Sequence, residues 1–254
     1  AAPGVGKTYA MLGEAHRRRD RGTDIVVGYV ETHGRLHTAE MVEGLEVVRR
    51  QEISYRGTTF TEMDVDAVIA RRPAVVCVDE LAHTNVPGSR HEKRAEDVEE
   101  IRRAGIDVIT PVNIQHLESL NDAVERITGI AQQETVPDAF VRAADQIELV
   151  DMSPEALRRR LAHGNVYPAD RVDAALANYF RIGNLAALRE LALLWVADRV
   201  EDTLQHYLAD HGIAEAWETR ERVVVALTGA PTGDQLIRRA ARMAGRQHGD
   251  LIGV

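Results

Sequence analysis

The sequence predicts an α/β fold, in which helices cover a mostly parallel β-sheet, followed by a helical segment and the start of a second α/β domain. Apolar, β-branched runs without alternation recur at 23–30, 74–80 and 106–113, which is typical of strands buried on both faces. Helical patterns separate these runs, so right-handed crossovers and parallel pairing are expected. From residue 153 the pattern is helical only, and an apolar run at 222–229 restarts the α/β pattern.

The chain opens on the pattern of a phosphate-binding loop, Ala1-Ala2-Pro3-Gly4-Val5-Gly6-Lys7-Thr8. Gly4 and Gly6 let successive backbone N–H groups point at one anion, and a helix starting near Lys7 adds the positive end of its dipole. Lys7 would reach the β- and γ-phosphates of ATP, and the Thr8 hydroxyl would hold Mg²⁺. The consensus G-x-x-x-x-G-K-[ST] has glycine where this chain has Ala1. A fold like that of the P-loop nucleoside triphosphatases is therefore expected, with nucleotide contacts from Pro3, Gly4, Val5, Gly6, Lys7 and Thr8.

A plainer explanation of the opening motif is a glycine-containing turn before an ordinary helix. The strand that should precede such a loop is missing, and the chain has no initiator methionine. We therefore interpret the sequence as a fragment cut within its first structural unit, whose missing strand would be a fifth in the sheet.

Residues 1–152 are expected to form the nucleotide-binding domain. Glycine or proline ends several of its helices: Gly22 closes the first, Pro73 stops the third and Gly105 caps the fourth. Gly57 marks the middle of a small hairpin over 53–61. The expected helices cover 7–21, 38–45, 64–72, 94–104 and 117–128, and the expected strands cover 23–30, 74–80, 106–113 and 146–150.

A helical extension is predicted over 153–209. Ser153 is a good N-cap with Pro154 at the first helical position, and this helix runs to residue 163. A second helix is expected over 169–180 and a long one over 185–208. Apolar residues recur along the long helix at spacings of three and four, and this stripe is expected to pack on its own domain; the alternatives are a homodimer seam or a signalling connector. The stripe consists of Leu188, Ala192, Val196, Val200, Leu204 and Tyr207. A linker over 210–221 then precedes a truncated domain over 222–254, with a buried strand at 222–229, a helix at 234–247 and a strand beginning at 250.

Composition narrows the class of protein. With 254 residues, 44% hydrophobic and 28% charged, the chain is typical of a soluble globular protein. A net charge of -9 argues against a nucleic-acid partner, because a phosphate backbone recruits clustered Lys and Arg. The single cysteine, Cys77, excludes a disulfide framework and a cysteine zinc site, which fits a reducing cytosol. No apolar run approaches the length of about 20 residues that a membrane span needs, so no membrane contact by this segment is expected.

Acidic and polar residues follow the predicted strands, at the sheet edge where ligands bind in open α/β folds. Asp79 is expected to hold Mg²⁺, and Glu80 to polarise a water or accept a proton as a catalytic base. Both acids would also suit a simple strand end. Asn113, with Gln115 and His116, could sense a γ-phosphate. The remaining candidates are Glu31 and His33 as substrate or domain contacts, and the basic residues Arg90, Lys93 and Arg94. Each of these three either supplies transition-state charge or simply belongs to a solvated loop.

Several motifs in order resemble the KdpD family of bacterial potassium-responsive sensor histidine kinases. They are residues 1–8, Glu-Thr-His-Gly-Arg at 31–35, Val-Asp-Glu-Leu-Ala-His-Thr-Asn at 78–85, Asn-Ile-Gln-His-Leu-Glu-Ser-Leu-Asn at 113–121, Asn-Tyr-Phe-Arg at 178–181 and Leu-Arg-Glu-Leu-Ala-Leu at 188–193. The resemblance covers nearly the whole chain and implies the cytoplasmic N-terminal region of an inner-membrane protein. It also implies that residue 222 begins a universal-stress-protein-like domain, and that a kinase core, absent here, acts on a response regulator.

Two functions of different classes follow, and a third is weaker. The first is an ATP-binding regulatory module that biases the downstream domains of its own chain and so the expression of potassium transport genes. The second is a stand-alone small-molecule kinase or ATPase with Glu80 as base. ATP turnover faster than about 1 s⁻¹ would support this second function. The third is a scaffold with a vestigial site, which predicts no ATP-dependent thermal shift.

Overall fold

A computed structural model describes residues 2–162, 176, 178–211, 222–227, 233–247 and 250–254. The chain divides into two compact units, Ala1–Arg199 and Val200–Val254, and each is described by itself. The domain boundaries predicted after residues 152, 209 and 221 stay predictions.

The first unit contains a parallel sheet, as the sequence predicts. Its strands are β1 (Ile25–Tyr29), β2 (Glu46–Val47), β5 (Val75–Val78) and β6 (Asp107–Ile109), in the order β2-β1-β5-β6. All three pairings are parallel, and Val26 of β1 lies beside Val76 of β5, which lies beside Val108 of β6. All residues of β1 and β5 are buried, because helices cover both faces of the sheet.

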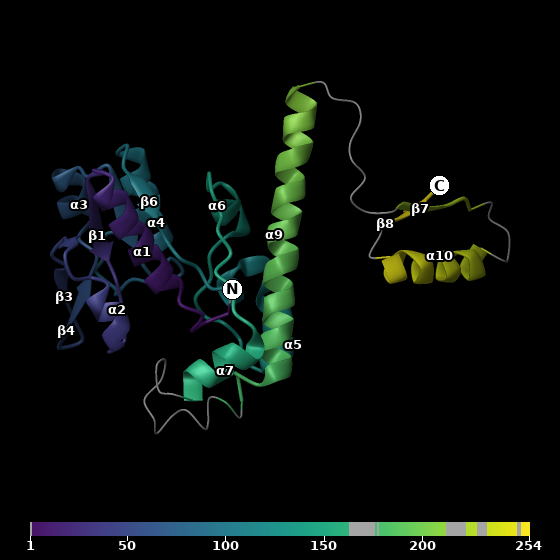
Figure 1. Cartoon of the computed structure of the whole chain (residues 1–254), viewed down its shortest axis with the longest axis horizontal. Helices are drawn as coiled ribbons and strands as arrows, with labels where there is room; N and C mark the ends of the chain where they lie inside the picture. The colour runs from purple at the N-terminus through teal and green to yellow at the C-terminus, as the bar shows by residue number, and fades with distance from the viewer. Residues whose placement is uncertain (1, 163–175, 177, 212–221, 228–232, 248–249) are drawn as a thin grey trace. The chain divides into compact units, whose positions relative to one another are not determined.

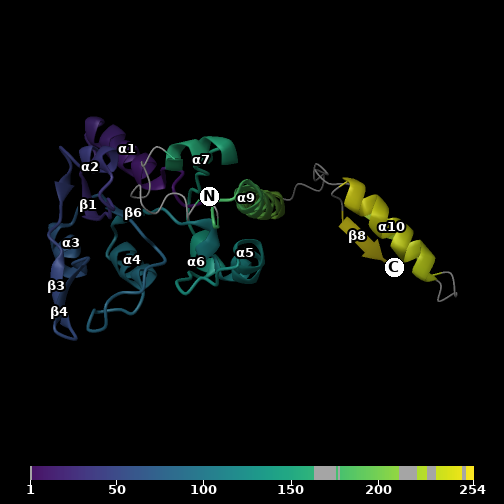
Figure 2. The same cartoon turned by 90° about the horizontal axis from the view of Figure 1, so that it is seen from below.

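Alternate residues of the central strands pack against different helices. On one face, Val27 and Cys77 join a cluster with Met11, Leu12 and Ala15 of α1 (Lys7–Asp20). On the other face, the sheet meets α3 (Val65–Arg71) and α4 (Arg94–Arg103), and the cluster there contains Val26, Val76, Val65, Val68, Val98 and Ile101. Figure 2 shows α1 and α4 on opposite sides of the sheet. The mixed α/β class with a helix-covered parallel sheet is therefore confirmed.

Smaller elements surround this sheet. The predicted hairpin is confirmed as β3 (Gln51–Tyr55) and β4 (Thr58–Glu62), which pair antiparallel across a turn at Arg56 and Gly57 with positive φ at both residues. The predicted helix at 64–72 is confirmed as α3, and Asp64 caps it by accepting a hydrogen bond from the Ala67 amide at 2.8 Å. The other elements are α2 (Leu36–Glu40), the 3₁₀ turns η1 (Ile114–His116) and η2 (Glu118–Leu120), α5 (Asn121–Thr128) and α6 (Asp138–Arg142).

Four element predictions differ from the structure, wholly or in part. Residues 146–150 form no strand; Ile147, Leu149 and Val150 instead pack their side chains against the core. The fourth strand is β2, which is two exposed residues long and gives no periodic signal. The strand predicted at 106–113 shortens to β6, which is only partly buried because it is an edge strand of the described sheet. Within the helix predicted at 117–128, residues 118–120 form the 3₁₀ turn η2 and the α-helix begins only at Asn121. The helix predicted at 38–45 lies at 36–40.

The helical segment packs on the sheet domain through the first half of its long helix. It begins with α7 (Pro154–Ala162), for which the Ser153 cap is confirmed by a 3.2 Å bond from the Ala156 amide to Ser153 Oγ. The long helix is α9 (Ile182–Asp210). Of the predicted stripe, Leu188 and Ala192 are buried in the core, whereas Val200 and Tyr207 are 63% and 53% exposed. The helix predicted at 169–180 lies almost wholly outside the described residues. Figure 1 shows α9 as the longest helix of the chain.

The second unit contains β7 (Arg222–Val225) and β8 (Asp250–Gly253), a parallel pair, and α10 (Gly233–Gln247). The prediction that the first of these strands is buried is wrong: its exposure alternates, and Val224 is 59% exposed. Most of the predicted linker, 212–221, lies outside the described residues. Among the residues with described positions, no helix combines the length and apolarity needed to cross a membrane.

Candidate functional site

A pocket of about 370 Å³ lies at the carboxyl edge of the parallel sheet. The opening loop of the chain forms one wall, and the segments that follow β1, β5 and β6 form the rest. Strands of a parallel sheet end at the same edge, so residues far apart in sequence meet there. The lining residues are Pro3, Gly4, Gly6, Lys7, Thr8, Tyr9, His33, Arg35, Thr38, Asp79, Glu80, Leu81, Ala82, His83, Pro111, Val112, Asn113, His116, Glu134 and Arg160.

The opening loop has a backbone shape that requires glycine at two positions. Gly4 has φ of 83° and Gly6 has φ of 99°, in the left-handed region that side chains with a Cβ avoid. Gly6 is also the N-cap of α1, so the first amides of that helix border the pocket. Val5 does not line the pocket; its side chain is buried in the core. Ala1 lies outside the described residues.

Lys7 is half-buried at the base of the loop. Its Nζ donates a hydrogen bond to the Ala2 carbonyl at 2.8 Å, across the loop. Desolvation lowers the pKa of Lys7 to about 7, although the nearby Asp79 carboxylate opposes the shift. The site therefore holds an amino group that can carry a proton near neutral pH, in the pocket that the loop borders.

Thr8 and Asp79, the two predicted Mg²⁺ ligands, are in contact. The Thr8 hydroxyl donates to Asp79 Oδ1 at 3.3 Å, and Asp79 is only 4% exposed. Two backbone amides also reach this carboxylate, from Glu80 at 2.9 Å and from Glu31 at 3.4 Å. Burial nevertheless raises the pKa of Asp79, because desolvation outweighs these bonds.

Glu80 lines the pocket beside Asp79, in a left-handed backbone conformation with φ of 55°. Its carboxylate pairs with His33 Nε2 at 3.1 Å, and His33 also has positive φ. The hydrogen bond between them lowers the pKa of Glu80 and raises the pKa of His33. A carboxylate with a lowered pKa is a weaker base. The catalytic role of Glu80 stays a prediction.

Of the three polar candidates after β6, two lie in the pocket and one lies outside it. Asn113 and His116 line the pocket, and burial lowers the pKa of His116. Gln115 lies elsewhere and donates to Gln132 Oε1 at 2.9 Å. Glu31 also lies outside the pocket lining, where it pairs with Arg50 at 3.5 Å.

The predicted source of transition-state charge at Arg94 is wrong. Arg94 is fully buried and donates to Glu62 Oε2 at 2.5 Å and to the Asp79 carbonyl at 3.4 Å. Its guanidinium also lies 3.7 Å from the centre of the Tyr29 ring. The other two cations of the loop are engaged as well: Arg90 pairs with Asp66, and Lys93 donates to Thr84. None of the three lines the pocket.

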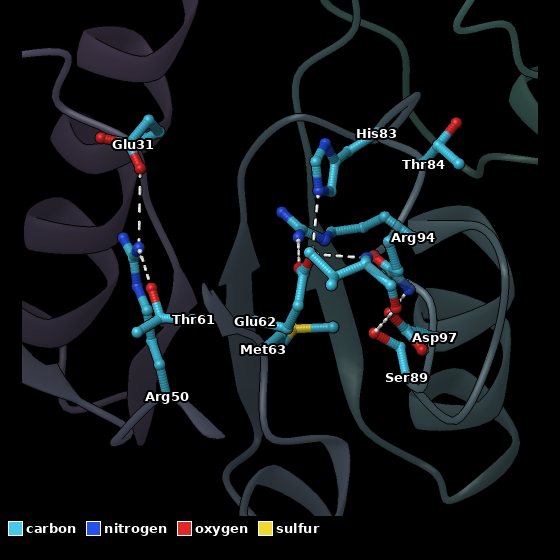
Figure 3. Close-up of polar contacts among 12 residues, drawn as sticks. Glu31, Arg50, Thr61, Glu62, Met63, His83, Thr84, Ser89, Arg94 and Asp97 are labelled. Atoms are coloured by element: carbon cyan, nitrogen blue, oxygen red, sulfur yellow. Dashed lines mark hydrogen bonds and ion pairs between the residues drawn. The ribbon is translucent and has the colours of Figure 1, made fainter. Parts of the chain in front are cut away.

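Arg94 belongs to a polar cluster made of Glu62, His83, Arg94 and Glu134, of which His83 and Glu134 also line the pocket. Glu62, the last residue of β4, contacts both His83 and Arg94 (Figure 3). His83 lies 3.1 Å from Glu62 and 3.3 Å from Glu134, and these two carboxylates raise its pKa to about 9. The same contacts lower the pKa of Glu134 to about 2. Sequence reasoning missed Glu62 and Glu134, because neither belongs to a motif.

Arg160 is the most distant lining residue that sequence reasoning missed. It lies on α7, more than 150 positions after the loop that it faces. In the sequence it is one of three consecutive arginines on an ordinary amphipathic helix. No pattern distinguishes the arginine that reaches the pocket from its neighbours.

Comparison with known proteins identifies the family of the chain. The profile of the family described as "KdpD: Osmosensitive K+ channel His kinase sensor domain" matches residues 1–200. The chain belongs to the KdpD sensor family. The Sensor protein KdpD of Mycobacterium tuberculosis is 64% identical over 252 residues, which cover 99% of this chain and 29% of that protein. The Escherichia coli K12 Sensor protein KdpD is 52% identical over 246 residues, covering 97% of this chain and 28% of that protein.

A shorter relative exists in Synechocystis. Its Putative sensor protein KdpD is 46% identical over 251 residues, which cover 99% of this chain and 67% of that protein. This chain therefore spans less than a third of the mycobacterial and E. coli KdpD proteins but about two thirds of the Synechocystis one.

Proposed function

We propose that the first unit binds Mg²⁺-ATP and regulates a larger potassium-responsive sensor kinase. One observation carries the proposal: the glycine loop, Lys7, Thr8 and Asp79, which lie up to 75 positions apart, border a single pocket at the carboxyl edge of the sheet. A triphosphate needs amide donors and an ammonium group at one place, and its metal needs a hydroxyl and a carboxylate beside them.

The side chains of the pocket are suited to binding Mg²⁺ together with a nucleotide. Within the part of the chain that the structure describes, no group of three or more His, Cys, Asp or Glu side chains is placed to hold a metal ion. Mg²⁺ usually takes one or two protein ligands and completes its shell with water and phosphate oxygens. Thr8 and Asp79, in contact at 3.3 Å, would supply that small protein share.

The regulatory function is preferred over the stand-alone kinase or ATPase because of the state of Glu80. Its pairing with His33 lowers the pKa of the carboxyl group and occupies one of its oxygens. The arginine and lysine residues of the 81–93 loop point to partners other than the pocket. A site with a weak base, to which the loop brings neither arginine nor lysine, is better suited to binding than to rapid turnover.

Family membership supplies the proposed setting. We place this segment in the cytoplasmic N-terminal region of a membrane sensor kinase, acting on its own downstream domains and through them on a response regulator. The Synechocystis relative is less than half as long as the E. coli one, judged by the share of each that this segment covers. Because the same segment occurs in proteins of such different length, we infer that it is a module that binds its own ligand.

A titration of the whole 254-residue chain with Mg²⁺-ATP in a calorimeter tests the proposal. We expect saturable binding, together with an ATP-dependent rise in melting temperature, and phosphate release slower than about 1 s⁻¹. Absence of binding would refute the nucleotide site, and rapid phosphate release that Glu80→Gln abolishes would favour the enzyme instead. In the full-length sensor, ATP binding is expected to shift the balance of kinase and phosphatase activity.

The affinity for ATP is expected to fall as the pH rises above 7. With a pKa of about 7, Lys7 of the free protein is protonated below that pH and neutral above it. Binding of a triphosphate favours the charged form, so above pH 7 the protein must first take up a proton. The dissociation constant should then rise about tenfold per pH unit between pH 7 and pH 9.

A matched variant tests whether Lys7 causes this pH dependence. Lys7→Arg keeps a cation that does not titrate in this range, so the dependence should flatten. His33 and His83 also line the pocket, and contacts with carboxylates raise the pKa of both. An equally steep dependence in Lys7→Arg would assign it to these histidines and contradict the prediction.

A further inference from the structure

Arg160 reaches the opening loop from the helical segment. Its guanidinium lies over Gly6: a Cβ placed on that glycine would be 3.1 Å from Arg160 Nη1 and 3.7 Å from Nη2. The side chain is half-buried and lines the pocket together with Lys7 and Thr8. Five guanidinium N–H donors are therefore held beside the loop proposed to bind phosphate.

Within the described part of the chain, no protein acceptor is recorded for these donors. Arg160 makes no hydrogen bond or ion pair with any residue in the described ranges. Its neighbour Arg158, by contrast, donates to the carbonyls of Leu176 at 2.9 Å and Phe180 at 2.5 Å. An arginine that faces a glycine loop without a protein partner is suited to a planar, two-point bond with a phosphate group.

Helix α7, which carries Arg160, is firmly joined to the start of α9. Leu157 and Leu161 of α7 are 1% exposed and share a core cluster with Leu185 and Leu188 of α9. The two carbonyls that Arg158 holds belong to residues just before α9, which begins at Ile182. A change in the position of α7 is therefore passed on to the first turns of α9.

A second bond strengthens this connection. Arg189 of α9 pairs with Asp151, just before α7, at 2.7 Å. Hydrogen bonds and ion pairs of the protein itself therefore join α7 to α9. No described residue accepts a hydrogen bond from Arg160 beside the opening loop.

We propose that Arg160 donates to a phosphate of the nucleotide on the opening loop, and that this bond ties α7 and α9 to the loop when nucleotide is bound. The proposal rests on the proposed function, because it needs a phosphate ligand at that loop. It names Arg160 as a nucleotide-binding residue outside the loop motif. This bond would also explain how nucleotide binding regulates the protein, because bound phosphate favours the arrangement in which α7 is held against the loop.

The test compares the wild-type chain with Arg160→Gln and with Arg159→Gln as the matched control. Arg159 is the adjacent residue on the same helix, is exposed, and does not line the pocket. Both variants remove one charge. In calorimetric titrations with Mg²⁺-ATP, we expect Arg160→Gln to weaken binding about tenfold to a hundredfold, and Arg159→Gln to change it less than about twofold. Arg160→Lys should fall between them, because it keeps the charge but loses the planar fork.

Amide hydrogen exchange at saturating ATP tests whether Arg160 couples the loop to α7 and α9, independently of its effect on the affinity for ATP. In the wild type and Arg159→Gln, ATP should slow exchange in 154–162 and 182–196. In Arg160→Gln the same regions should exchange as in the free protein, even when the loop is saturated. Melting temperatures without nucleotide should agree among the variants; if Arg160→Gln unfolds, Arg160→Lys carries the comparison.

The outcomes are distinct from those of the proposed function. If the wild type binds ATP and Arg160→Gln and Arg160→Lys bind it equally well, the Arg160 proposal is overturned while the nucleotide site stands. If Arg160→Gln binds weakly but keeps the protection of α7 and α9, the coupling is overturned. If the wild type does not bind ATP at all, the proposed function itself has failed.

Discussion

Lys7→Met is expected to weaken Mg²⁺-ATP binding at least about a hundredfold at pH 7, because it removes the ammonium group that would contact the phosphates. It should not lower the free energy of unfolding of the nucleotide-free chain. Burial lowers the pKa of Lys7 to about 7, so the fold gains little from this cation and an apolar side chain of similar length suits the site better. Calorimetry with ATP and urea unfolding without it measure the two effects separately.

Lys93→Met is the matched control for this change. The chain contains only these two lysines, and Lys93 donates to Thr84 outside the pocket lining. We expect Lys93→Met to leave the affinity for ATP within about twofold of the wild type, as for other surface changes away from a site. Equal losses in the two variants would mean that Lys7 has no specific part in binding. A lower free energy of unfolding in Lys7→Met than in the wild type would contradict the interpretation that Lys7 contributes to ligand binding and not to stability.

Arg94→Met is expected to lower the free energy of unfolding by about 3–5 kcal/mol, because it leaves the buried Glu62 carboxylate without the fully buried one of its two cations, with His83 alone beside it. Arg94 is fully buried and Glu62 is 3% exposed, so water replaces little of the lost interaction. The Asp79 carbonyl would lose its 3.4 Å bond from Arg94 as well. Urea unfolding monitored by circular dichroism measures the loss, and ATP titration measures the effect on the site.

Two further variants show whether the buried charge is the cause. Arg94→Met combined with Glu62→Gln removes both charges but keeps an acceptor for the Val86 amide, which Glu62 now binds at 2.9 Å. This double variant should recover most of the lost stability. Arg102→Met breaks the exposed pair with Glu99 and should change the free energy of unfolding by less than about 0.5 kcal/mol. A loss below about 1 kcal/mol in Arg94→Met would contradict the prediction.

The elements that the sequence predicts correctly are those with a strong local signal. The central strands β1 and β5 are continuous apolar runs, and α3 has Asp64 as a cap and Pro73 beyond its end. The strand predicted at 146–150 has a similar apolar composition but makes no ladder. An apolar run shows only that side chains are buried, and Ile147 and Leu149 satisfy that by packing without strand hydrogen bonds.

The opposite error occurs at β2. Glu46 and Val47 are exposed and carry no pattern, yet they pair with Val26 and Val27 of β1. Their place in the sheet is set by the course of the chain between α2 and the hairpin. A two-residue edge strand depends on its neighbour for its hydrogen bonds, so local sequence cannot predict it.

The candidate site divides in the same way. Residue types at fixed spacing are enough to predict the glycine loop, Lys7, Thr8 and the acids after β5, because a phosphate loop needs them in that order. Tertiary contacts, in contrast, place Arg94 outside the pocket lining and bring Arg160 to the loop from α7. An arginine looks the same in the sequence whether a buried Glu62 pairs with it or whether, as for Arg160, no partner is found among the described residues. Which of these holds depends on contacts between elements far apart in the chain.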